Sequence, residues 1–457
     1  MQEKTVRLFT NMTIKQAQIK LGITSFRDPQ EKIIKSIIKN ETTLALLPTG
    51  YGKSICYQIP GLIKTGYTLV ISPLIALMDD QVFHLRQKNI SAIALHSNQT
   101  LNQTIFLNLF EKKHYKFIYL SPEKLLLSNQ TTIFKKNPPS LIALDEAHCF
   151  SIWGNDFRPI YKQLPNYISQ LKPTPAIALF TATASKKVTH DLIVNFKIKR
   201  KNIFTGDFFR KNLFIIHQQF FLRSQKFLYL CYLIFHKYKN LNGLIYCITR
   251  KETAMIFQAL KKMDFYNQLE IDYFHAGRTK KNKTLILEKF LNKKLKILVT
   301  TNAFGLGVDK DDLNYVIHYQ VPDQLENYVQ EIGRAGRNGK LACCELLVHQ
   351  HDFEINLNLS KNKTNLKIMK NFVNNNHCHH QKILNFFGQK TTRDFNCRSC
   401  NLCSPSCELV NHQLKKRTKF LSSEIFINQQ QYLFNYEQQP HFFHRYNSVG
   451  TGYSQVC

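Results

Sequence analysis

The sequence predicts an α/β protein with two parallel sheets in tandem, followed by a small metal-binding subdomain. Three observations predict this fold. Short aliphatic runs recur with amphipathic stretches between them, a polar basic segment divides these runs into two series, and four cysteines crowd between positions 378 and 403. Continuous apolar runs are typical of parallel strands that are buried on both faces. At roughly 100–200 residues per domain, a chain of 457 residues that is 44% hydrophobic can form two to four domains.

The predicted strands follow one another in two series. The first series comprises TLALLP (43–48), TLVISP (68–73), KFIYLSP (116–122), LIALDEA (141–147) and AIALFTAT (176–183). The second comprises GLIYCIT (243–249), KILVTT (296–301) and YVIHYQV (315–321). The segment 199–213 between them is basic and has no clear periodicity, so we expect the linker there. From about residue 404 the sequence is rich in Gln, Asn and aromatic residues without a pattern, which predicts a poorly ordered tail.

The charge of the chain favours a polyanionic partner. The 62 Lys and Arg residues against 31 Asp and Glu give a formal net charge of +31, and each phosphate that such residues neutralise releases counterions. Part of this excess reflects a lysine- and asparagine-rich composition, so it supports nucleic-acid binding without proving it. The start lacks the apolar region of a secretory signal, and the longest apolar run (227–235) is half a membrane span. We therefore expect a soluble cytoplasmic protein with reduced thiols.

The first predicted strand ends in LPTGYGKS (47–54), which resembles a phosphate-binding loop. The glycines allow backbone N–H groups to curl around phosphate oxygens, the lysine supplies a cation, and the serine opens a helix and can ligate magnesium. The nucleotide-binding set predicted here is Thr49, Gly50, Gly52, Lys53 and Ser54. The strict pattern fails at Leu47, which is not glycine, so an accidental strand-to-helix turn is the alternative.

The fourth predicted strand ends in the acids of LDEAH (144–148). Asp145 stands where a strand-end carboxylate holds Mg²⁺ in nucleotide hydrolases, and Glu146 beside it can orient or deprotonate the attacking water. Together with the phosphate loop, these residues predict hydrolysis of a nucleoside triphosphate.

With both motifs in place, residues 20–405 resemble the RecQ-type DNA helicases of superfamily 2. Besides the two motifs above, six segments match the family in order: FRDPQ (26–30), SPLIALMDDQ (72–81), TATA (181–184), HAG (275–277), AFGLGVDK (303–310) and QEIGRAGRNG (330–339). A lone GRAGR is weak evidence. Eight motifs in the right order are specific, and DEAH followed by WGNDFRP distinguishes this family from RNA helicases.

The resemblance implies the domain organisation, the activity and the partners. It implies two RecA-like domains (1–202, which binds ATP, and 203–348), a zinc-binding helical subdomain (349–405) and a tail (406–457). It further implies an ATP- and Mg²⁺-dependent 3′–5′ DNA helicase of recombination and repair that acts on single-stranded and partly duplex DNA. Single-strand-binding protein or repair factors are the implied protein partners. A DNA-stimulated translocase with weak unwinding and a non-enzymatic DNA-binding scaffold are the alternatives.

Several further site residues follow from the resemblance. Gln30 is expected to read the adenine edge and Arg27 to cover the adenine ring, because Ile23 stands where the family often has an aromatic residue. His275 is expected to contact DNA. Tyr51 replaces a glycine of the phosphate loop, and Asn155 replaces a histidine, so one coupling hydrogen bond can differ.

An arginine pair is predicted to complete the ATP site from the second domain. A phosphate loop surrounds the triphosphate from one side only, so charge that develops on the γ-phosphoryl group needs a cation from across a cleft. Arg334 and Arg337 are three positions apart, which predicts that they share one face of a helix. A solvated basic turn is the alternative.

The loop 149–159 resembles the aromatic-rich loop that couples DNA to ATP in this family. It contains Phe150, Trp153, Asp156, Phe157 and Arg158, and Trp153 is the only tryptophan of the chain. Stacking of a base on an aromatic ring is worth ~1–3 kcal/mol and tolerates any base sequence. The alternative is that Trp153 fills the core.

The cysteines Cys378, Cys397, Cys400 and Cys403 have the spacing C-x18-C-x2-C-x2-C, which suits one tetrahedral Zn²⁺. They resemble the zinc-binding subdomain of RecQ helicases, in a structural role. His377, His379 and Cys407 are nearby substitutes for the fourth ligand, and unliganded cysteines are the alternative. Only about fifty residues follow, fewer than the roughly 100 of a small domain, so we expect no strand-separating winged helix.

Overall fold

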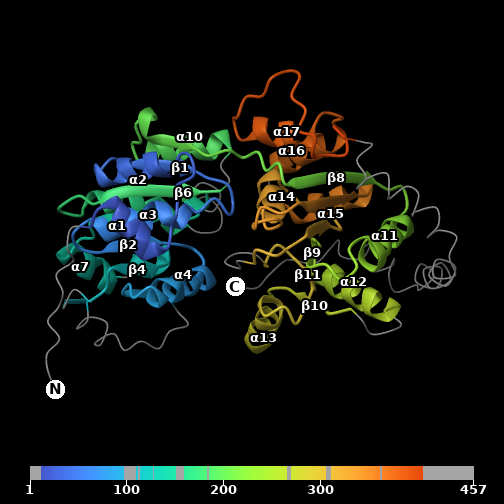
Figure 1. The fold of residues 1–457 in the computed structure, drawn as a ribbon, viewed down its shortest axis with the longest axis horizontal. Coiled ribbons are helices and arrows are strands. Elements are labelled where there is room, and N and C mark those ends of the chain that lie inside the picture. The colour runs from blue at the N-terminus through green and yellow to red at the C-terminus, as the bar shows by residue number, and fades with distance from the viewer. Residues whose placement is uncertain are drawn as a thin grey trace, which may run out of the picture.

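The computed structural model describes residues 12–96, 110–111, 114–126, 128–150, 159–182, 185–264, 269–304, 310–360 and 363–404. These residues form two lobes, each built on a parallel sheet, with a helical subdomain beside the second (Figure 1). This arrangement confirms the predicted fold class. No helix in the described ranges combines the length and the apolar character that crossing a bilayer requires.

The N-terminal lobe contains a seven-stranded sheet in the order β3-β4-β2-β5-β6-β1-β7. Its strands are β1 (Thr43–Leu46), β2 (Thr68–Ile71), β3 (Ala92–Leu95), β4 (Phe117–Leu120), β5 (Leu141–Leu144), β6 (Ala176–Thr181) and β7 (Ile203–Thr205). All neighbouring strands are parallel, and Leu46 at the end of β1 lies opposite Thr181 at the end of β6. Because the strands are parallel, the loops after β1, β5 and β6 meet at one edge of the sheet.

Helices cover both faces of this sheet. They are α1 (Ile14–Leu21), α2 (Gln30–Ile38), α3 (Lys53–Ile63), α4 (Ile75–Gln87), α6 (Pro122–Leu125), α7 (Ser128–Lys136), α9 (Leu164–Ser169) and α10 (Lys186–Asn195). Successive residues of β1 point to opposite faces: Ala45 belongs to the core cluster under α1, α2 and α3, whereas Leu44 and Leu46 belong to the cluster on the other face. This is why the strand sequence is apolar throughout.

The C-terminal lobe contains a six-stranded parallel sheet in the order β10-β11-β9-β12-β13-β8. Its strands are β8 (Leu213–Gln219), β9 (Gly243–Tyr246), β10 (Ile271–Phe274), β11 (Ile297–Thr300), β12 (Tyr315–His318) and β13 (Ala342–Val348). The helices around it are α11 (Arg223–Tyr232), which continues into a π-helical turn (Leu233–Lys237), α12 (Arg250–Met263), α13 (Lys280–Leu291) and α14 (Leu325–Ile332).

The sequence pattern missed three strands of this lobe, β8, β10 and β13. Two of them carry a charged residue that interrupts the apolar run. Asp272 lies inside β10 and pairs with Arg278 at 3.2 Å, and Glu345 lies fully buried inside β13. Lys237 Nζ lies 2.6 Å from Glu345 Oε1, and the hydroxyl of Tyr238 donates to the same oxygen at 2.8 Å. A buried charge is tolerated in a strand when it is satisfied in this way.

The third part of the structure consists of α15 (Gln350–Leu359), α16 (Lys363–Asn374) and α17 (His379–Phe386), followed by a cysteine-rich loop. The loop attaches to β8: Ile215 N donates to Ser399 O at 3.0 Å, and Asn401 N donates to Ile215 O at 3.0 Å. In Figure 1, α16 and α17 lie along β8 on the side where the chain passes from one lobe to the other.

Candidate active site

The phosphate loop connects β1 to α3. Gly50 and Gly52 have φ angles of 75° and 81°, in the left-handed region that glycine adopts without strain. A β-carbon on Gly52 would lie 2.8 Å from Gln30 Nε2, so the amide of Gln30 closely approaches the loop there. Lys53 and Ser54 form the first turn of α3. The local geometry is therefore a backbone cradle at a helix N-terminus, the arrangement that binds phosphate.

Gln30 at the start of α2 and Arg27, three positions before it, hold the phosphate loop. The Nε2 of Gln30 donates to Tyr51 O at 2.8 Å, its Oε1 accepts from Arg27 N at 2.8 Å, and Arg27 Nη1 donates to Gly50 O at 3.1 Å. Tyr51, which departs from the family pattern, is anchored too, because its hydroxyl donates to Asp28 O at 2.5 Å and Arg27 lies 5.8 Å from its ring centroid. The substitution adds contacts to the loop.

The two acids after β5 face the lysine of the phosphate loop. Lys53 Nζ lies 3.0 Å from Glu146 Oε1, with 14% and 13% of the two side chains exposed. Burial by itself would lower the pKa of Lys53, but the negative charges of Glu146 and Asp145 outweigh it and raise that pKa. Burial raises the pKa of Asp145 to about 6, and contact with Lys53 lowers the pKa of Glu146 against the effect of its burial. The site thus holds a fixed cation between two carboxylates.

His148 links these acids to the end of β6. Its Nδ1 lies 2.9 Å from Thr181 Oγ1 and 3.4 Å from Glu146 Oε2. Burial lowers its pKa, so the ring is neutral near pH 7. Thr181 belongs to the TATA segment, whose last two residues lie outside the described ranges. A shift in the position of the Thr181 side chain can therefore move Glu146 through the imidazole ring of His148.

The arginine pair of the C-terminal lobe faces this site across the gap between the lobes. A β-carbon on Gly50 would lie 3.6 Å from Arg337 Cγ, and one on Gly333 would lie 3.3 Å from Thr49 Cβ. Arg334 lines a cavity of about 190 Å³ together with Glu146 and His148. The structure thus brings Lys53, the two acids and both arginines to one site.

The expectation that the two arginines share a helix face is wrong. Helix α14 ends at Ile332, and residues 333–339 form turns. Gly336, between the two arginines, has a φ angle of 57°, in the left-handed region, so this segment is not helical. The turn still presents both side chains to the N-terminal lobe.

Two residues of the linker, which the sequence analysis did not single out, hold this turn. Arg210 Nη2 donates to Ala335 O at 3.2 Å and to Gly336 O at 2.9 Å. Asn212 Nδ2 donates to Gly336 O and Lys340 O, both at 2.8 Å. The linker therefore fixes the carbonyls between the two arginines. The only signal for it in the sequence was the polar, basic character of the segment.

The donor set fits a bound nucleotide. Within the described ranges, Arg334 is 7% exposed and its Nε has no hydrogen-bond partner. A buried guanidinium nitrogen without an acceptor is costly unless an anion occupies the space beside it. Together with the phosphate loop across the gap, this orphaned donor matches a triphosphate, and the carboxylate of Asp145 with the hydroxyl of Ser54 matches the oxygen ligands that Mg²⁺ prefers.

The structure changes the interpretation of one aromatic residue. Phe150 is 5% exposed and packs edge-to-face on Phe196, with ring centroids 5.3 Å apart. It belongs to the core of the N-terminal lobe and is not available to stack on bases. The side chain turns inward because residues 145–148 form turns after β5, and Cys149 and Phe150, which follow them, pack in the core. The other residues of the predicted coupling loop, Trp153, Asn155, Asp156, Phe157 and Arg158, lie outside the described ranges.

His275 lies directly after β10, at the carboxyl end of that strand. A β-carbon on Gly277 would lie 3.1 Å from Arg250 Nη1 and 3.3 Å from His275 Nδ1, so the three residues adjoin. Burial and the charges of Arg250 and Arg278 lower the pKa of His275. The place is basic, as a contact with phosphate requires. Residues 305–309 of the AFGLGVDK segment lie outside the described ranges.

The four predicted zinc ligands come together. The thiol sulfurs of Cys378, Cys397, Cys400 and Cys403 all lie within 4.8 Å of one another. Tetrahedral Zn–S bonds of about 2.3 Å place sulfur atoms roughly 3.8 Å apart, so the cluster fits one Zn²⁺. The nearby His379 is engaged elsewhere, since its Nε2 lies 3.0 Å from Asn401 Oδ1 and its ring stacks on His217 at 3.7 Å. Cys407 lies outside the described ranges.

Comparisons with known families and proteins follow the same division of the chain. A DEAD/DEAH box helicase model matches residues 27–192, a helicase conserved C-terminal domain model matches 225–339, and a RecQ zinc-binding model matches 349–404. The chain is 34% identical over 419 residues to a putative ATP-dependent RNA helicase of Acanthamoeba polyphaga mimivirus, covering 89% of this chain and 74% of that protein. It is 36% identical to the ATP-dependent DNA helicase RecQ of Bacillus subtilis, over 84% of this chain. The chain belongs to the RecQ-type helicases.

The RecQ-type chain spans less than two thirds of the length of two of these relatives. This chain covers 65% of the Bacillus subtilis RecQ. It also covers 66% of a probable ATP-dependent DNA helicase RecS from the same organism, and the two are 38% identical over 73% of this chain. Among solved structures, Saccharomyces cerevisiae Dbp5 bound to RNA and ADP BeF3 has a TM-score of 0.59 at 15% identity, covering 83% of this chain and 92% of that one. The helicase MrfA bound to DNA has a TM-score of 0.61 at 16% identity, covering 76% and 49%. These structures share the fold.

The match to the RecQ zinc-binding family and the four-cysteine cluster confirm the zinc prediction.

Proposed function

We propose that the chain is an ATP- and Mg²⁺-dependent DNA helicase that moves 3′ to 5′ along single-stranded DNA and unwinds duplexes in recombination and repair. One observation carries the proposal: the lysine and acids of the N-terminal lobe and the arginine pair of the C-terminal lobe meet at one site. Neither lobe alone surrounds a triphosphate. Closure of the lobes therefore depends on nucleotide, and opening on its hydrolysis, which converts the ATP cycle into movement.

Each residue has a role in this proposal. Lys53 binds the β- and γ-phosphates, and Asp145 with Ser54 holds Mg²⁺, which neutralises charge on the phosphates when bound. Glu146 orients the attacking water and accepts its proton. Because Lys53 contacts Glu146 at 3.0 Å, binding of phosphate by Lys53 competes with this ion pair and frees the carboxylate. Arg334 and Arg337 stabilise the charge that develops on the transferred group.

The remaining assignments extend this scheme. Gln30 and Arg27 bind the adenine, and they connect it to the phosphate loop through the bonds to Tyr51 and Gly50. His275 contacts DNA from the C-terminal lobe. We assign the domains as 1–202, 203–348 and 349–405, and place the enzyme in the cytoplasm, at the nucleoid in a bacterium. Single-strand-binding protein or repair factors are its proposed partners.

The test is ATP hydrolysis with and without single-stranded DNA in the variants Lys53→Ala and Glu146→Gln. Both should lose turnover by about 100-fold or more, while DNA binding is largely kept, because the hydrolytic groups are distinct from the basic surface. Glu31→Gln on α2, an exposed acid, is the matched control and should keep normal turnover. Normal DNA-stimulated ATP hydrolysis in either active-site variant would refute the mechanism. If the unaltered chain hydrolysed no ATP, the alternative of a non-enzymatic DNA-binding scaffold would be favoured.

A further inference from the structure

The turn between β8 and α11 exposes an aromatic side chain almost completely. Phe221 is 94% exposed and the next residue, Leu222, is 56% exposed, whereas Phe220 is 7% exposed and packs against Tyr229 with ring centroids 5.4 Å apart. Burial of a phenylalanine is one of the more stabilising contributions that a side chain can make. The ring of Phe220 is buried and contributes in this way, whereas the ring of Phe221 is not.

The exposure does not come from a loosely attached loop. Phe220 N donates to Val348 O at 2.9 Å, and His349 Nε2 lies 3.2 Å from Phe221 O. The Nδ1 of His349 accepts from His351 N at 3.1 Å, so the proton is on Nε2 and is donated to Phe221. The backbone on both sides of the ring is therefore bound to the end of β13.

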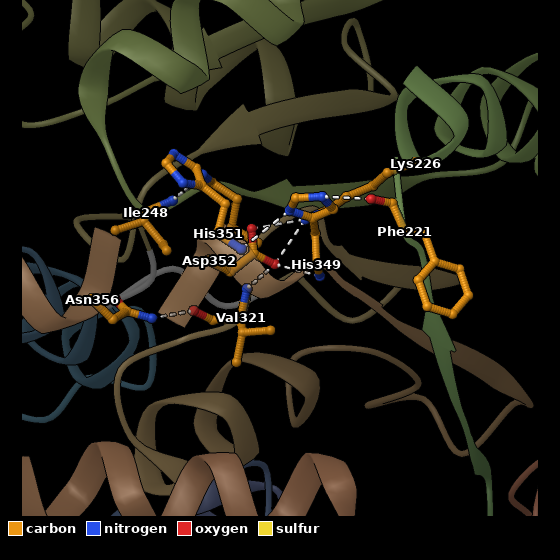
Figure 2. Close-up of polar contacts among 9 residues, drawn as sticks. Phe221, Lys226, Ile248, Val321, His349, His351, Asp352 and Asn356 are labelled. Atoms are coloured by element: carbon orange, nitrogen blue, oxygen red, sulfur yellow. Dashed lines mark hydrogen bonds and ion pairs between the residues drawn. The ribbon is translucent and has the colours of Figure 1, made fainter. Parts of the chain in front are cut away.

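His349 is in turn held by a buried ion pair. Its N donates to Asp352 Oδ2 at 3.1 Å, and the same carboxylate lies 2.8 Å from Lys226 Nζ. Asp352 and Lys226 are 3% and 2% exposed, so this pair joins the start of α15 to the first turns of α11. Figure 2 shows this network with the ring of Phe221 pointing away from it. The turn is thus built to hold one ring outside the core.

The ring lies at the edge of the sheet where the proposed DNA contacts lie. In a parallel sheet the carboxyl ends of all strands lie at one edge. The turn with Phe221 follows the carboxyl end of β8, His275 follows the carboxyl end of β10, and Arg250 comes after the carboxyl end of β9. Three strand spacings of about 4.8 Å separate β9 from β8, or ~14 Å. Burial raises the pKa of Glu252 in the first turn of α12, and the nearby charge of Arg223, which is exposed two positions after Phe221, acts against this rise. Basic residues therefore follow the carboxyl ends of three strands of this sheet: His275 after β10, Arg250 after β9 and Arg223 after β8.

We propose that Phe221 is a stacking platform for a base of bound single-stranded DNA, and that Arg223 contacts the adjoining phosphate. Proteins that bind single strands without sequence preference combine exposed aromatic rings with a basic groove. An apolar protein partner fits less well, because among the described residues of this turn only Phe221 and Leu222 are exposed and apolar, and a specific protein interface buries about 800 Å² per partner. The proposal rests on the proposed helicase function and adds a contact at the far end of the DNA path.

The test compares Phe221→Ala and Phe221→Trp with the unaltered chain in equilibrium binding to a single-stranded oligonucleotide, followed by fluorescence anisotropy without nucleotide. Loss of one stacked base should weaken binding by about 5- to 150-fold in Phe221→Ala. Phe221→Trp keeps an aromatic ring and should bind about as tightly as the unaltered chain. Leu291→Ala is the matched control, since this side chain is 45% exposed at the end of α13, which leads to the opposite edge of the sheet. It should bind as the unaltered chain does.

A second oligonucleotide, made of abasic sites, separates stacking from other effects. It keeps the phosphates but offers no base, so Phe221→Ala and the unaltered chain should bind it equally. Equal binding of ordinary DNA by Phe221→Ala would overturn the proposal, and so would the same loss on abasic DNA. Because no ATP is hydrolysed in this assay, the outcome is independent of the hydrolysis test that decides the proposed function. Melting temperatures should be unchanged, which excludes a folding defect.

Discussion

Glu146 contacts both Lys53 and His148 in the candidate active site. Its φ angle is 50°, in the left-handed region that costs a non-glycine residue of order 1 kcal/mol or more, and such strain is commonly found at active sites. The backbone is held there because Asp145 N donates to Ile71 O and Ala147 N donates to Phe180 O, at 2.9 and 2.8 Å. The sheet thus forces the carboxylate toward Lys53 and His148.

At the same scale, two neighbouring aromatic residues should behave differently. Phe150→Ala removes a buried ring, and we expect a loss of about 3–5 kcal/mol in the free energy of unfolding, with all activities reduced together. Trp153→Ala, if the loop 149–159 couples DNA to ATP, should keep ATP affinity and much of the DNA affinity. It should lose the stimulation of ATP hydrolysis by DNA, and unwinding should fall further still.

Melting temperature and DNA-stimulated ATP hydrolysis measured on both variants decide between these roles. Phe150→Ala serves as the reference for a core residue. If Trp153→Ala melts at a similarly reduced temperature and loses every function in parallel, Trp153 is a packing residue and the coupling hypothesis is wrong.

At the scale of elements, the linker connects three parts of the molecule. It holds the arginine turn through Arg210 and Asn212. The residues just after α17 hold the linker in turn: Phe208 stacks on Phe387 at 4.7 Å, and Gln389 Oε1 accepts from Phe208 N at 3.2 Å. The segment is therefore a structural support for the arginines as well as a connection. Its bonds run to backbone carbonyls, so they fix the path of the turn.

We expect Arg210→Ala to lower the turnover number of ATP hydrolysis by about 10- to 100-fold, because it removes both bonds to the carbonyls of Ala335 and Gly336, and small misplacement of a catalytic cation is costly. The KM for ATP should change little, since the phosphate loop lies in the other lobe. Steady-state kinetics over a range of ATP concentrations separates the two parameters. Lys211→Ala, an exposed neighbour, is the control, and an equal rise in KM would contradict a positioning role.

The zinc cluster is the second element that can be tested. We expect about one zinc per chain, and Cys400→Ser should lose the metal and melt at a lower temperature, because a structural site contributes folding free energy. The residues beside Cys400 bond to Ile215, so the edge of the second sheet should loosen as well. Elemental analysis and thermal unfolding measure both effects. The control is Cys231→Ser, which changes a buried thiol far from the cluster in the sequence and should leave the zinc bound. Absence of zinc from the reduced, unaltered protein would refute the prediction.

At the scale of the whole molecule, the charge of +31 predicts how DNA binding responds to salt. For single strands the logarithm of affinity falls by about 0.7 per contacted phosphate for each tenfold rise in salt. Contact with about five phosphates would weaken binding on the order of 100-fold between 50 and 200 mM salt. Base sequence should matter little, because phosphate contacts and stacking carry no base code. Binding titrations at several salt concentrations check this, and a flat dependence would mean that the charge plays no part in binding.

The sequence by itself determined the features that short segments encode. An apolar run followed by glycines, Lys53 and Ser54 specifies a strand, a cradle and a helix start without help from distant residues, and the cysteine spacing specifies most of a tetrahedral site. The order of the eight motifs identified the family for the same reason. Strands with a buried charge, such as Glu345 in β13, broke the local pattern and were missed.

The tertiary structure alone decided which side chains meet and which face they take. Arg210 bonds to Gly336 although the two are 126 positions apart, and Lys53 reaches Glu146 across 93 positions. Phe150 turns into the core and Phe221 out of it, although both have apolar neighbours in the sequence. The physical reason is that the burial of a side chain and the partner of a charge depend on what the rest of the chain packs against them. Residue type and spacing limit these outcomes, and only the packing of distant segments selects one of them.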